Sequence, residues 1–376
     1  MIKIIADDKI PFLKGALEPY AEVAYLPGKQ ITRDVVNEAD ALLIRTRTKC
    51  TESLLKGTSI RFIGAATIGF DHIDIQYCKK HNIRWTNAPG CNSSSVQQYI
   101  AATLLKMATG FRFNLKNKTI GIVGVGNVGS KVESLARALG MNVLLNDPPR
   151  TRKEGEKNFV TLGNILHVSD IVTVHVPLSI VGVDKTYHLF NDKSFEKMKR
   201  GAWFINTSRG EVTETAALNK TLESGKPGGA VIDVWENEPD IDLDLMAKAF
   251  IATPHIAGYS TDGKANGTAM VVNSLCDFFD LPLKNWYPDN VPLPPNPGIT
   301  IEGKGKSDED IIREAVFYTY DISSDDIKFR FSPSDFEIQR DNYPLRREFP
   351  SYRINLIGVT KRVQKTLESL GFRIEI

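Results

Sequence analysis

The stretch TIGIVGVGNVGSKVESLARALG, residues 119–140, constrains the fold of this chain more than any other part of its sequence. An apolar run over 120–123 precedes Gly124, Gly126 and Gly129, which form a G-x-G-x-x-G pattern, and an amphipathic helical pattern follows at once. Glycines collect in many loops, so the spacing alone is weak. A strand before it and a helix after it are the context of a dinucleotide-binding turn.

Each residue of this motif has a physical task in such a turn. Gly124 permits the tight turn, Gly126 lets the backbone approach a pyrophosphate, and Gly129 lets the helix pack closely on the strand. The N–H groups at the helix N-terminus would bind the pyrophosphate. Asp147, at the end of the next apolar run, is placed to accept hydrogen bonds from the adenosine ribose, and its charge disfavours a 2′-phosphate. NAD is therefore favoured over NADP, although Arg150 opposes that preference in part.

Apolar, β-rich runs alternate with helical patterns on both sides of this motif, which predicts parallel sheets covered by helices. The predicted strands are 2–7, 22–27, 41–45, 61–66 and 84–88 before the motif, and 119–126, 142–147, 170–177, 202–208 and 230–235 from the motif onward. A long helix over 92–111 connects the two series, and a helical pattern returns over 261–280. With 376 residues the chain is too long for one ordinary core.

The composition of the sequence changes after residue 286. Five prolines fall within the twelve residues of 287–298, which is typical of a linker or an extended arm. A helix is predicted over 308–320, and a strand-helix-strand unit over 352–376. These features predict a third, small α/β module over 287–376.

Composition excludes several classes of function. The formal net charge is only +2, so nothing draws the whole chain to nucleic acid or to an anionic membrane. No run of 18 apolar residues predicts a membrane span, and the N-terminus lacks the apolar region of a signal peptide. The four cysteines form no C-x-x-C pair and fit thiols in a reducing compartment, and no spacing suggests a metal site. We therefore expect a cytoplasmic protein with no metal.

The family resemblance described below implies a 2-hydroxy acid as substrate, and three side chains could assist its oxidation by a bound nicotinamide. The hydroxyl proton needs a base that works near neutral pH, and His255 in TPHIAGYS supplies one. The substrate carboxylate needs a fixed cation, and the planar fork of Arg209 suits it. Glu238 would hold the imidazole and stabilise its protonated form. Each residue follows a predicted strand, where open parallel sheets place their ligands.

Each of these residues also has a plainer interpretation. Arg209 could be a surface turn residue, Glu238 one solvated carboxylate among several, and His255 a packing residue. His175 also follows a strand. We interpret it as packing or lining the nicotinamide side, with a catalytic role as the alternative.

The motifs HVPL (175–178), FINTSRGEV (204–212), VIDVWENEP (231–239) and PHIAGYS (254–260), together with the glycine loop, resemble the D-isomer-specific 2-hydroxyacid dehydrogenases. They occur in that family's order over roughly residues 1–285. PGCNSSSV, NDPPR and HIAGYSTDGKA extend the resemblance, over nearly the whole chain, to a member of the family that acts on a phosphorylated substrate.

The resemblance implies an α/β protein with two Rossmann-like doubly wound domains, the substrate domain being discontinuous, plus a small C-terminal α/β dimerisation module. The expected boundaries are 1–95 with 256–286 for the substrate domain, 96–255 for the NAD-binding domain and 287–376 for the module. A homodimer is expected.

The resemblance also implies contacts to NAD and to the substrate. Besides the three glycines and Asp147, the implied cofactor residues are Asn127, Val128, Val176, Thr207, Ser208, Asp233 and Gly258. Asp233 would reach the nicotinamide carboxamide, or would serve only as a strand-end cap. The implied substrate residues are Thr46, Thr67 and Tyr259.

A basic stretch in the first domain suggests which hydroxy acid is used. Arg45, Arg47 and Lys49 alternate, so an extended segment would point them to one side, toward a substrate phosphate. The alternative is a solvated basic sheet edge. A phosphorylated 2-hydroxy acid is the expected substrate. The alternatives are a different phosphorylated acid, such as 3-phosphoglycerate, and an NAD-sensing, corepressor-like interaction protein.

Overall fold

The computed structural model describes residues 1–375, which form two compact units. Within the described residues, one unit comprises 1–92 and 260–293, and the other comprises 93–259 and 294–375. These bounds differ by a few residues from the expected ones, and the C-terminal segment groups with the predicted NAD-binding segment. The assignment of binding roles to domains stays a prediction.

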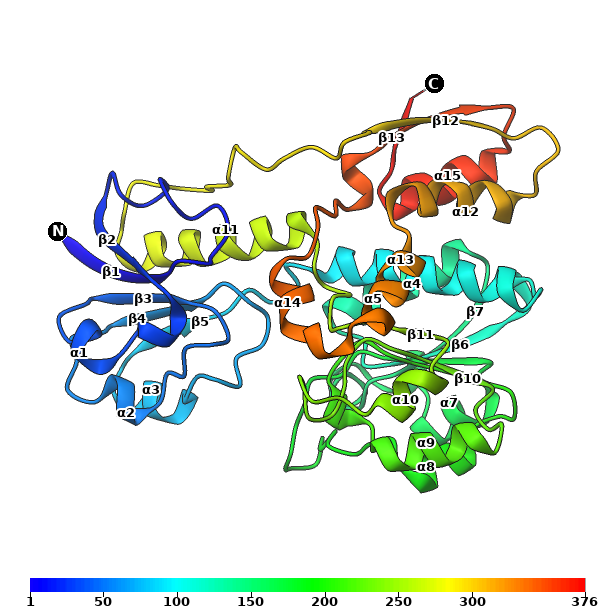
Figure 1. Ribbon diagram of the computed structural model, residues 1–376, viewed down its shortest axis with the longest axis horizontal. Coiled ribbons are helices and arrows are strands. Elements are labelled where there is room, and N and C mark those ends of the chain that lie inside the picture. Colours follow the sequence, from blue (N-terminus) through cyan, green and yellow to red (C-terminus); the bar gives the residue numbers. More distant parts are fainter. Residues whose placement is uncertain (376) are drawn as a thin grey trace. The chain divides into compact units, whose positions relative to one another are not determined.

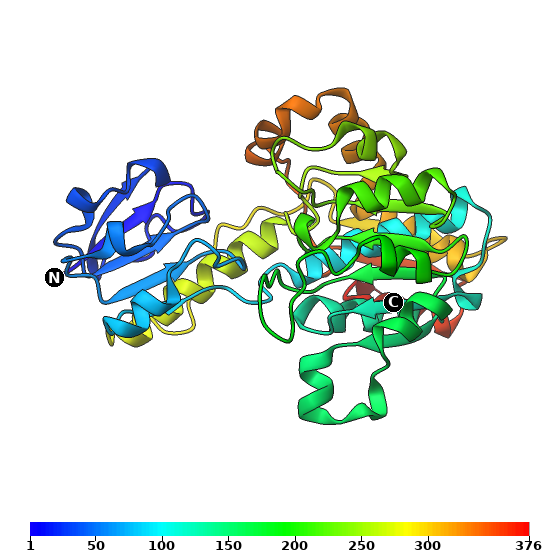
Figure 2. The ribbon, with the colours of Figure 1, turned by 90° about the horizontal axis from the view of Figure 1, so that it is seen from below.

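The first unit contains a five-stranded parallel sheet in the order β2-β1-β3-β4-β5, an order shared by flavodoxin-like folds. Its strands are β1 (Ile2–Asp7), β2 (Ala21–Leu26), β3 (Ala41–Ile44), β4 (Phe62–Ala65) and β5 (Arg84–Thr86). Its helices are α1 (Arg33–Val36), α2 (Glu52–Leu55), α3 (Ile75–Lys80) and α11 (Thr261–Phe278). Helix α11 lies along one face of the sheet, where Val271 and Leu275 join the apolar core (Figures 1 and 2).

The second unit contains a six-stranded parallel sheet in the order β11-β10-β9-β8-β6-β7. Its strands are β6 (Thr119–Val123), β7 (Asn142–Asn146), β8 (Ile171–Val174), β9 (Trp203–Asn206), β10 (Gly229–Ile232) and β11 (Ile251–Ala252). The direction of winding reverses between β6 and β8. Ligands of open α/β sheets bind at the carboxyl ends of the strands at such a point.

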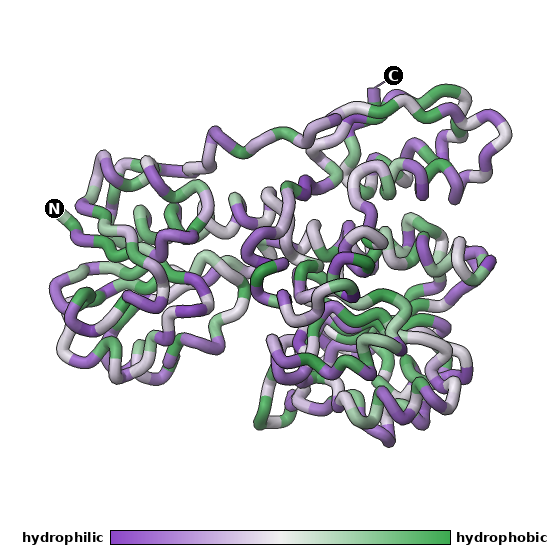
Figure 3. Tube along the Cα trace, viewed as in Figure 1, coloured by the Kyte–Doolittle hydropathy of each residue, from purple (hydrophilic) through white to green (hydrophobic). Residues whose placement is uncertain are grey.

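Helices cover both faces of this sheet. Ile205 of β9 faces one apolar core, while its neighbour Phe204 faces the other. Figure 3 shows how hydrophobic residues follow these strands. Because both faces are buried, the strands read as continuous apolar runs. The helices are α4 (Ser93–Gly110), α5 (Asn127–Ala138), α6 (Pro148–Glu154), α7 (Leu162–Val168), α8 (Asp192–Lys197), α9 (Thr215–Glu223) and α10 (Leu243–Lys248).

The C-terminal module contains a three-stranded parallel sheet in the order β12-β13-β14. Its elements are β12 (Gly298–Glu302), α12 (Asp308–Thr319), α13 (Ile322–Phe331), α14 (Phe336–Asp341), β13 (Arg353–Ile357), α15 (Lys361–Leu370) and β14 (Arg373–Glu375). Strand β12 and helices α13 and α14 were not predicted. Short 3-10 turns elsewhere are η1 (Gly28–Gln30), η2 (Leu115–Asn117), η3 (Glu156–Asn158), η4 (Gly210–Val212), η5 (Pro333–Asp335) and η6 (Phe349–Ser351).

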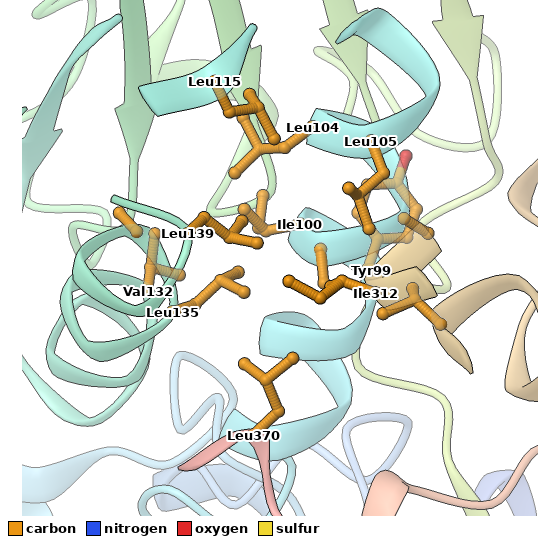
Figure 4. Close-up of a cluster of buried hydrophobic side chains, with 14 of the residues drawn as sticks. Tyr99, Ile100, Leu104, Leu105, Leu115, Val132, Leu135, Leu139, Ile312 and Leu370 are labelled. Carbon is orange, nitrogen blue, oxygen red and sulfur yellow. The ribbon is translucent and has the colours of Figure 1, made fainter. Parts of the chain in front are cut away.

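Helix α4 joins the module to the predicted NAD-binding part of this unit through one apolar core. Figure 4 shows Ile100 and Leu104 of α4 with Leu135 of α5, Ile312 of α12 and Leu370 of α15. The residues of α4 are buried on nearly every side of the helix. Such burial means that other elements of this unit enclose α4 and that it presents no broad polar face to water.

Candidate active site

The three predicted catalytic residues follow neighbouring parallel strands at the same edge of the six-stranded sheet. Arg209 follows β9, Glu238 follows β10, and His255 follows β11. The loops after β9 and β10 are in direct contact: a Cβ added to Gly210 would lie 2.0 Å from the carbonyl carbon of Trp235. Only glycine allows this approach, so Gly210 sets the position of the arginine beside it.

His255 and Glu238 form a hydrogen-bonded pair. The imidazole Nδ1 and the carboxylate Oε2 are 2.8 Å apart, and the other carboxylate oxygen accepts the Trp235 N–H at 2.9 Å. Burial raises the pKa of Glu238, but the charge of His255 and these hydrogen bonds outweigh burial and hold the pKa below its usual value. The carboxylate thus stays ionised and orients the ring. The opposite ring nitrogen, Nε2, has no hydrogen-bond partner within residues 1–375.

The loop that carries His255 is held by Asp233. His255 has φ 56°, a left-handed conformation that is uncommon for a non-glycine residue, and its N–H donates to the Asp233 carbonyl at 2.7 Å. The buried Asp233 carboxylate accepts the Ile256 N–H at 2.8 Å, the Ala257 N–H at 3.0 Å and the Thr253 hydroxyl at 2.6 Å. Asp233 therefore caps the strand end, and its predicted contact to the cofactor stays a prediction.

Arg209 is partly buried and keeps most of its hydrogen-bonding capacity. Its Nη1 donates to the Ser208 carbonyl at 2.8 Å, and no carboxylate in the described part of the chain pairs with it. Ser208 is turned inward, with its hydroxyl donating to Asn206 Oδ1 at 2.9 Å. The guanidinium can therefore bind a carboxylate from outside the chain.

His175 lies in a different environment from His255. Its ring nitrogens lie 3.0 Å from the Thr173 hydroxyl and 3.3 Å from the Thr207 hydroxyl. Burial lowers the pKa of His175 to about 3. A base with so low a pKa is poorly matched to neutral pH. This environment favours the packing or lining interpretation over the catalytic one.

The glycine loop has the shape that a pyrophosphate site requires. Gly124 has φ +87°, and a Cβ there would lie 2.7 Å from the His175 carbonyl oxygen. A Cβ on Gly129 would lie 2.0 Å from the Gly124 carbonyl oxygen, whereas one on Gly126 would meet nothing within 4 Å. Gly126 is the N-cap residue of α5 and provides no side-chain cap, so the first N–H groups of the helix remain open to a ligand.

Asp147 and Arg150 lie next to this loop. The Asp147 carboxylate accepts the Val125 N–H at 2.8 Å and the Arg150 N–H at 3.0 Å. The Arg150 guanidinium pairs with both oxygens of Glu154 at 2.8 Å and donates to the Val125 carbonyl at 2.8 Å. Because Arg150 is engaged in this way, it offers little to a 2′-phosphate, and the charge of Asp147 remains the main selective feature.

The other predicted cofactor residues surround the same sheet edge. Asn127 and Val128 open α5, and Val176 lies against Gly124, where an added Cβ would be 2.8 Å from its Cγ1. Gly258 follows the segment held by Asp233. Their contacts to a cofactor stay predictions.

The predicted substrate residues Thr46 and Thr67 belong to the first unit. Thr46 is exposed, and the Thr67 hydroxyl donates to the Gly69 carbonyl at 3.2 Å. The expectation of an extended basic segment is wrong, because β3 ends at Ile44 and a turn follows, with Thr48 N–H donating to the Arg45 carbonyl at 3.4 Å. Because the segment is not extended, the alternation of Arg45, Arg47 and Lys49 in the sequence does not place their side chains on one side of a strand.

Two arginines of the C-terminal module contact the His255 loop, and sequence reasoning missed both. Arg346 is buried and donates to the Ala257 carbonyl at 2.6 Å and to the Ser95 hydroxyl. Arg340 lies with its guanidinium carbon 5.5 Å from the centre of the Tyr259 ring. Both lie in IQRDNYPLRREF, where only the density of arginines could have drawn attention.

Comparison with known proteins decides the family. A family model described as the NAD-binding domain of D-isomer specific 2-hydroxyacid dehydrogenases matches residues 94–257. An erythronate-4-phosphate dehydrogenase from Bacteroides fragilis (strain YCH46) is 51% identical over 354 residues, which cover 94% of this chain and 99% of that protein. The chain belongs to the D-isomer-specific 2-hydroxyacid dehydrogenase family.

Two further relatives show how far the likeness to this dehydrogenase family extends. An erythronate-4-phosphate dehydrogenase from Porphyromonas gingivalis is 40% identical over 372 residues and covers 99% of this chain and 100% of its own. The solved D-lactate dehydrogenase from Aquifex aeolicus, complexed with NAD and lactic acid, is 26% identical with a TM-score of 0.62, over 74% of this chain and 95% of its own.

The family's NAD-binding domain, as matched here, contains the glycine loop, Asp147 and all three predicted catalytic residues. A second family model, described as a domain of unknown function, matches residues 292–371. Within residues 1–375, no helix is long and apolar enough to span a bilayer, and no three His, Cys, Asp or Glu side chains are grouped to hold a metal ion.

Proposed function

We propose that this protein oxidises the 2-hydroxyl group of 4-phospho-D-erythronate to (R)-3-hydroxy-2-oxo-4-phosphooxybutanoate with NAD, a reaction of pyridoxal 5′-phosphate biosynthesis. The observation that carries the proposal is the 2.8 Å pair of His255 and Glu238 at the strand edge that also carries the glycine loop. The substrate follows from the relatives named erythronate-4-phosphate dehydrogenase, which align over nearly the whole chain.

In this proposal His255 moves the proton. Its Nε2 takes the hydroxyl proton during oxidation and returns it during reduction. Glu238 holds the ring through Nδ1 and stabilises the imidazolium that forms. Arg209 binds the substrate carboxylate through its fork and polarises the C2–O bond.

NAD is the proposed cofactor, and bound NAD would accept the hydride from C2. The loop of Gly124, Gly126 and Gly129, with Asn127 and Val128, would hold the pyrophosphate. Asp147 would bind the adenosine ribose. The other proposed contacts are Val176, Thr207, Ser208, Asp233 and Gly258. The open space at Gly126 and the uncapped start of α5 support this assignment.

Thr46, Thr67 and Tyr259 remain proposed substrate contacts, and the protein is proposed to act in the cytoplasm.

A panel of 2-hydroxy acids tests the function. The full chain with NAD should oxidise 4-phospho-D-erythronate about 10²-fold more efficiently in kcat/KM than D-erythronate, because the phosphate adds charge-assisted hydrogen bonds. NADH absorbance measures the rates, with 3-phosphoglycerate as a second phosphorylated acid. Equal efficiency with and without the phosphate would contradict the proposed substrate class.

The proposed assembly is a homodimer formed through the C-terminal module. Sedimentation at micromolar concentration should therefore give a species of twice the 41.8 kDa chain mass. A surface substitution outside the module, such as Lys56→Gln, should leave that mass unchanged. A monomer at that concentration would contradict the dimer.

A further inference from the structure

Arg340 brings a positive charge from the C-terminal module to the loop that carries the acid–base pair. It lies on α14, with its guanidinium carbon 5.5 Å from the ring centres of both Tyr259 and Phe336. Burial alone lowers the pKa of Arg340, but Tyr259 and the carboxylate of Glu238 raise it overall. The guanidinium is therefore close enough to the site to interact with its charges.

The Arg340 guanidinium leaves one of its donors without an acceptor in the described chain. Its side chain is 19% exposed, and its Nη1 forms an ion pair at 3.1 Å with Oε1 of Glu337, whose side chain is 43% exposed. Its Nε is buried without a hydrogen-bond partner in the described chain. Leaving a buried donor without an acceptor is costly, and an oxygen atom of a ligand would supply the acceptor.

The neighbouring Arg346 provides a contrast. It is 4% exposed, its Nη2 donates to the Ala257 carbonyl, and its guanidinium carbon lies 4.5 Å from the centre of the Tyr320 ring. Its contacts hold the loop from the inside. Both arginines have a buried Nε without a hydrogen-bond partner in the described chain, but Arg340 is the more accessible of the two, so it is the better candidate for an external ligand.

We propose that Arg340 is a substrate-binding residue that contacts the phosphate end of the phosphorylated 2-hydroxy acid. The inference rests on the proposed function, in which Arg209 binds the carboxylate and His255 the hydroxyl. The second anionic group then needs its own cation, and the planar fork of arginine matches phosphate oxygens. The C-terminal module would thus contribute directly to substrate selection.

Steady-state kinetics of the full-length protein test this role with Arg340→Gln. We expect kcat/KM for 4-phospho-D-erythronate to fall about 10- to 100-fold, mostly through KM, because charge-assisted hydrogen bonds to the phosphate are lost. D-Erythronate, which lacks the phosphate, should change less than about threefold, and KM for NAD should not change. Arg353→Gln, at an exposed position of the same module, is the matched control and should behave as wild type.

An equal loss on both acids would overturn the proposal and make Arg340 a positioning residue that acts through Tyr259. Thermal melting and NADH binding establish that Arg340→Gln is folded. If it is not, Arg340→Lys keeps the charge without the fork and should show the same selective loss, reduced in size. Thermal melting in the presence of inorganic phosphate separates this inference from the proposed function. If wild type does not oxidise 4-phospho-D-erythronate, the proposed function fails. The phosphate contact is still supported if inorganic phosphate raises the melting temperature of wild type but not that of Arg340→Gln.

Discussion

Replacing His255 with asparagine is expected to slow NAD-dependent oxidation of the hydroxy acid by roughly 10²–10⁴-fold. Asparagine tolerates the left-handed backbone conformation of residue 255, and its N–H can still donate to the Asp233 carbonyl. It cannot take up the substrate proton, so the loss should appear in kcat. The fall is measured by NADH absorbance at saturating substrate and NAD. Binding of NAD should persist, because the glycine loop follows β6 whereas His255 follows β11.

The control for this prediction is His167→Asn, which changes an exposed histidine near the end of α7. It should retain wild-type turnover. NADH fluorescence tests whether the His255 variant still binds cofactor. Near-normal turnover of that variant would remove the proton-transfer role from His255.

Replacing Arg209 with glutamine is expected to lower kcat/KM for the hydroxy acid by about 10²–10⁴-fold, because two hydrogen bonds between charged groups, each contributing about 1.5–3 kcal/mol, are lost. The guanidinium has no carboxylate partner within residues 1–375, so the substitution breaks no described ion pair and should spare the fold. Initial rates over a range of acid concentrations measure the effect, with NAD held at saturation.

Arg209→Lys distinguishes the fork from the charge, since lysine keeps the charge but lacks paired donors. It should fall between wild type and Arg209→Gln. Arg200→Gln, at an exposed position before β9, should have no effect. An unchanged KM for the acid together with an unchanged kcat in Arg209→Gln would exclude Arg209 as the carboxylate ligand.

The parts of the fold and site that depend on local pattern were predictable from the sequence. Apolar runs bounded by polar turns predicted every strand of the two larger sheets except the two-residue β11, because strands buried on both faces have few polar interruptions. The positions of Arg209, Glu238 and His255 after such strands predicted a common edge, and the structure places the Glu238 carboxylate 2.8 Å from His255. Strand ends tended to be predicted too late, since β8 stops at Val174 rather than at residue 177.

Features that depend on contacts between distant segments were not predictable in this way. The turn after Ile44 separates basic residues that a strand would have aligned, and no local pattern marks its start. Asp233 could be interpreted as a cap or as a cofactor ligand, and only the fold shows its bonds to Ile256 and Ala257. Arg340 belongs to a short helix without a recognisable motif, 81 residues beyond the tyrosine that it approaches. Periodicity reports which face of an element is apolar, but it does not report which element covers that face.

The enclosure of α4 has a consequence for how this architecture can be altered. Helix α4 lies in one buried apolar cluster with residues of α5, such as Leu135, and of the C-terminal module, such as Ile312, as Figure 4 shows. Cutting the chain after the proline-rich segment would leave part of that helix's apolar surface in water, a change that disfavours the native state. The folding of the second unit therefore depends on the C-terminal module. Chimeras that exchange it between homologues would need a matching α4 to fold cooperatively.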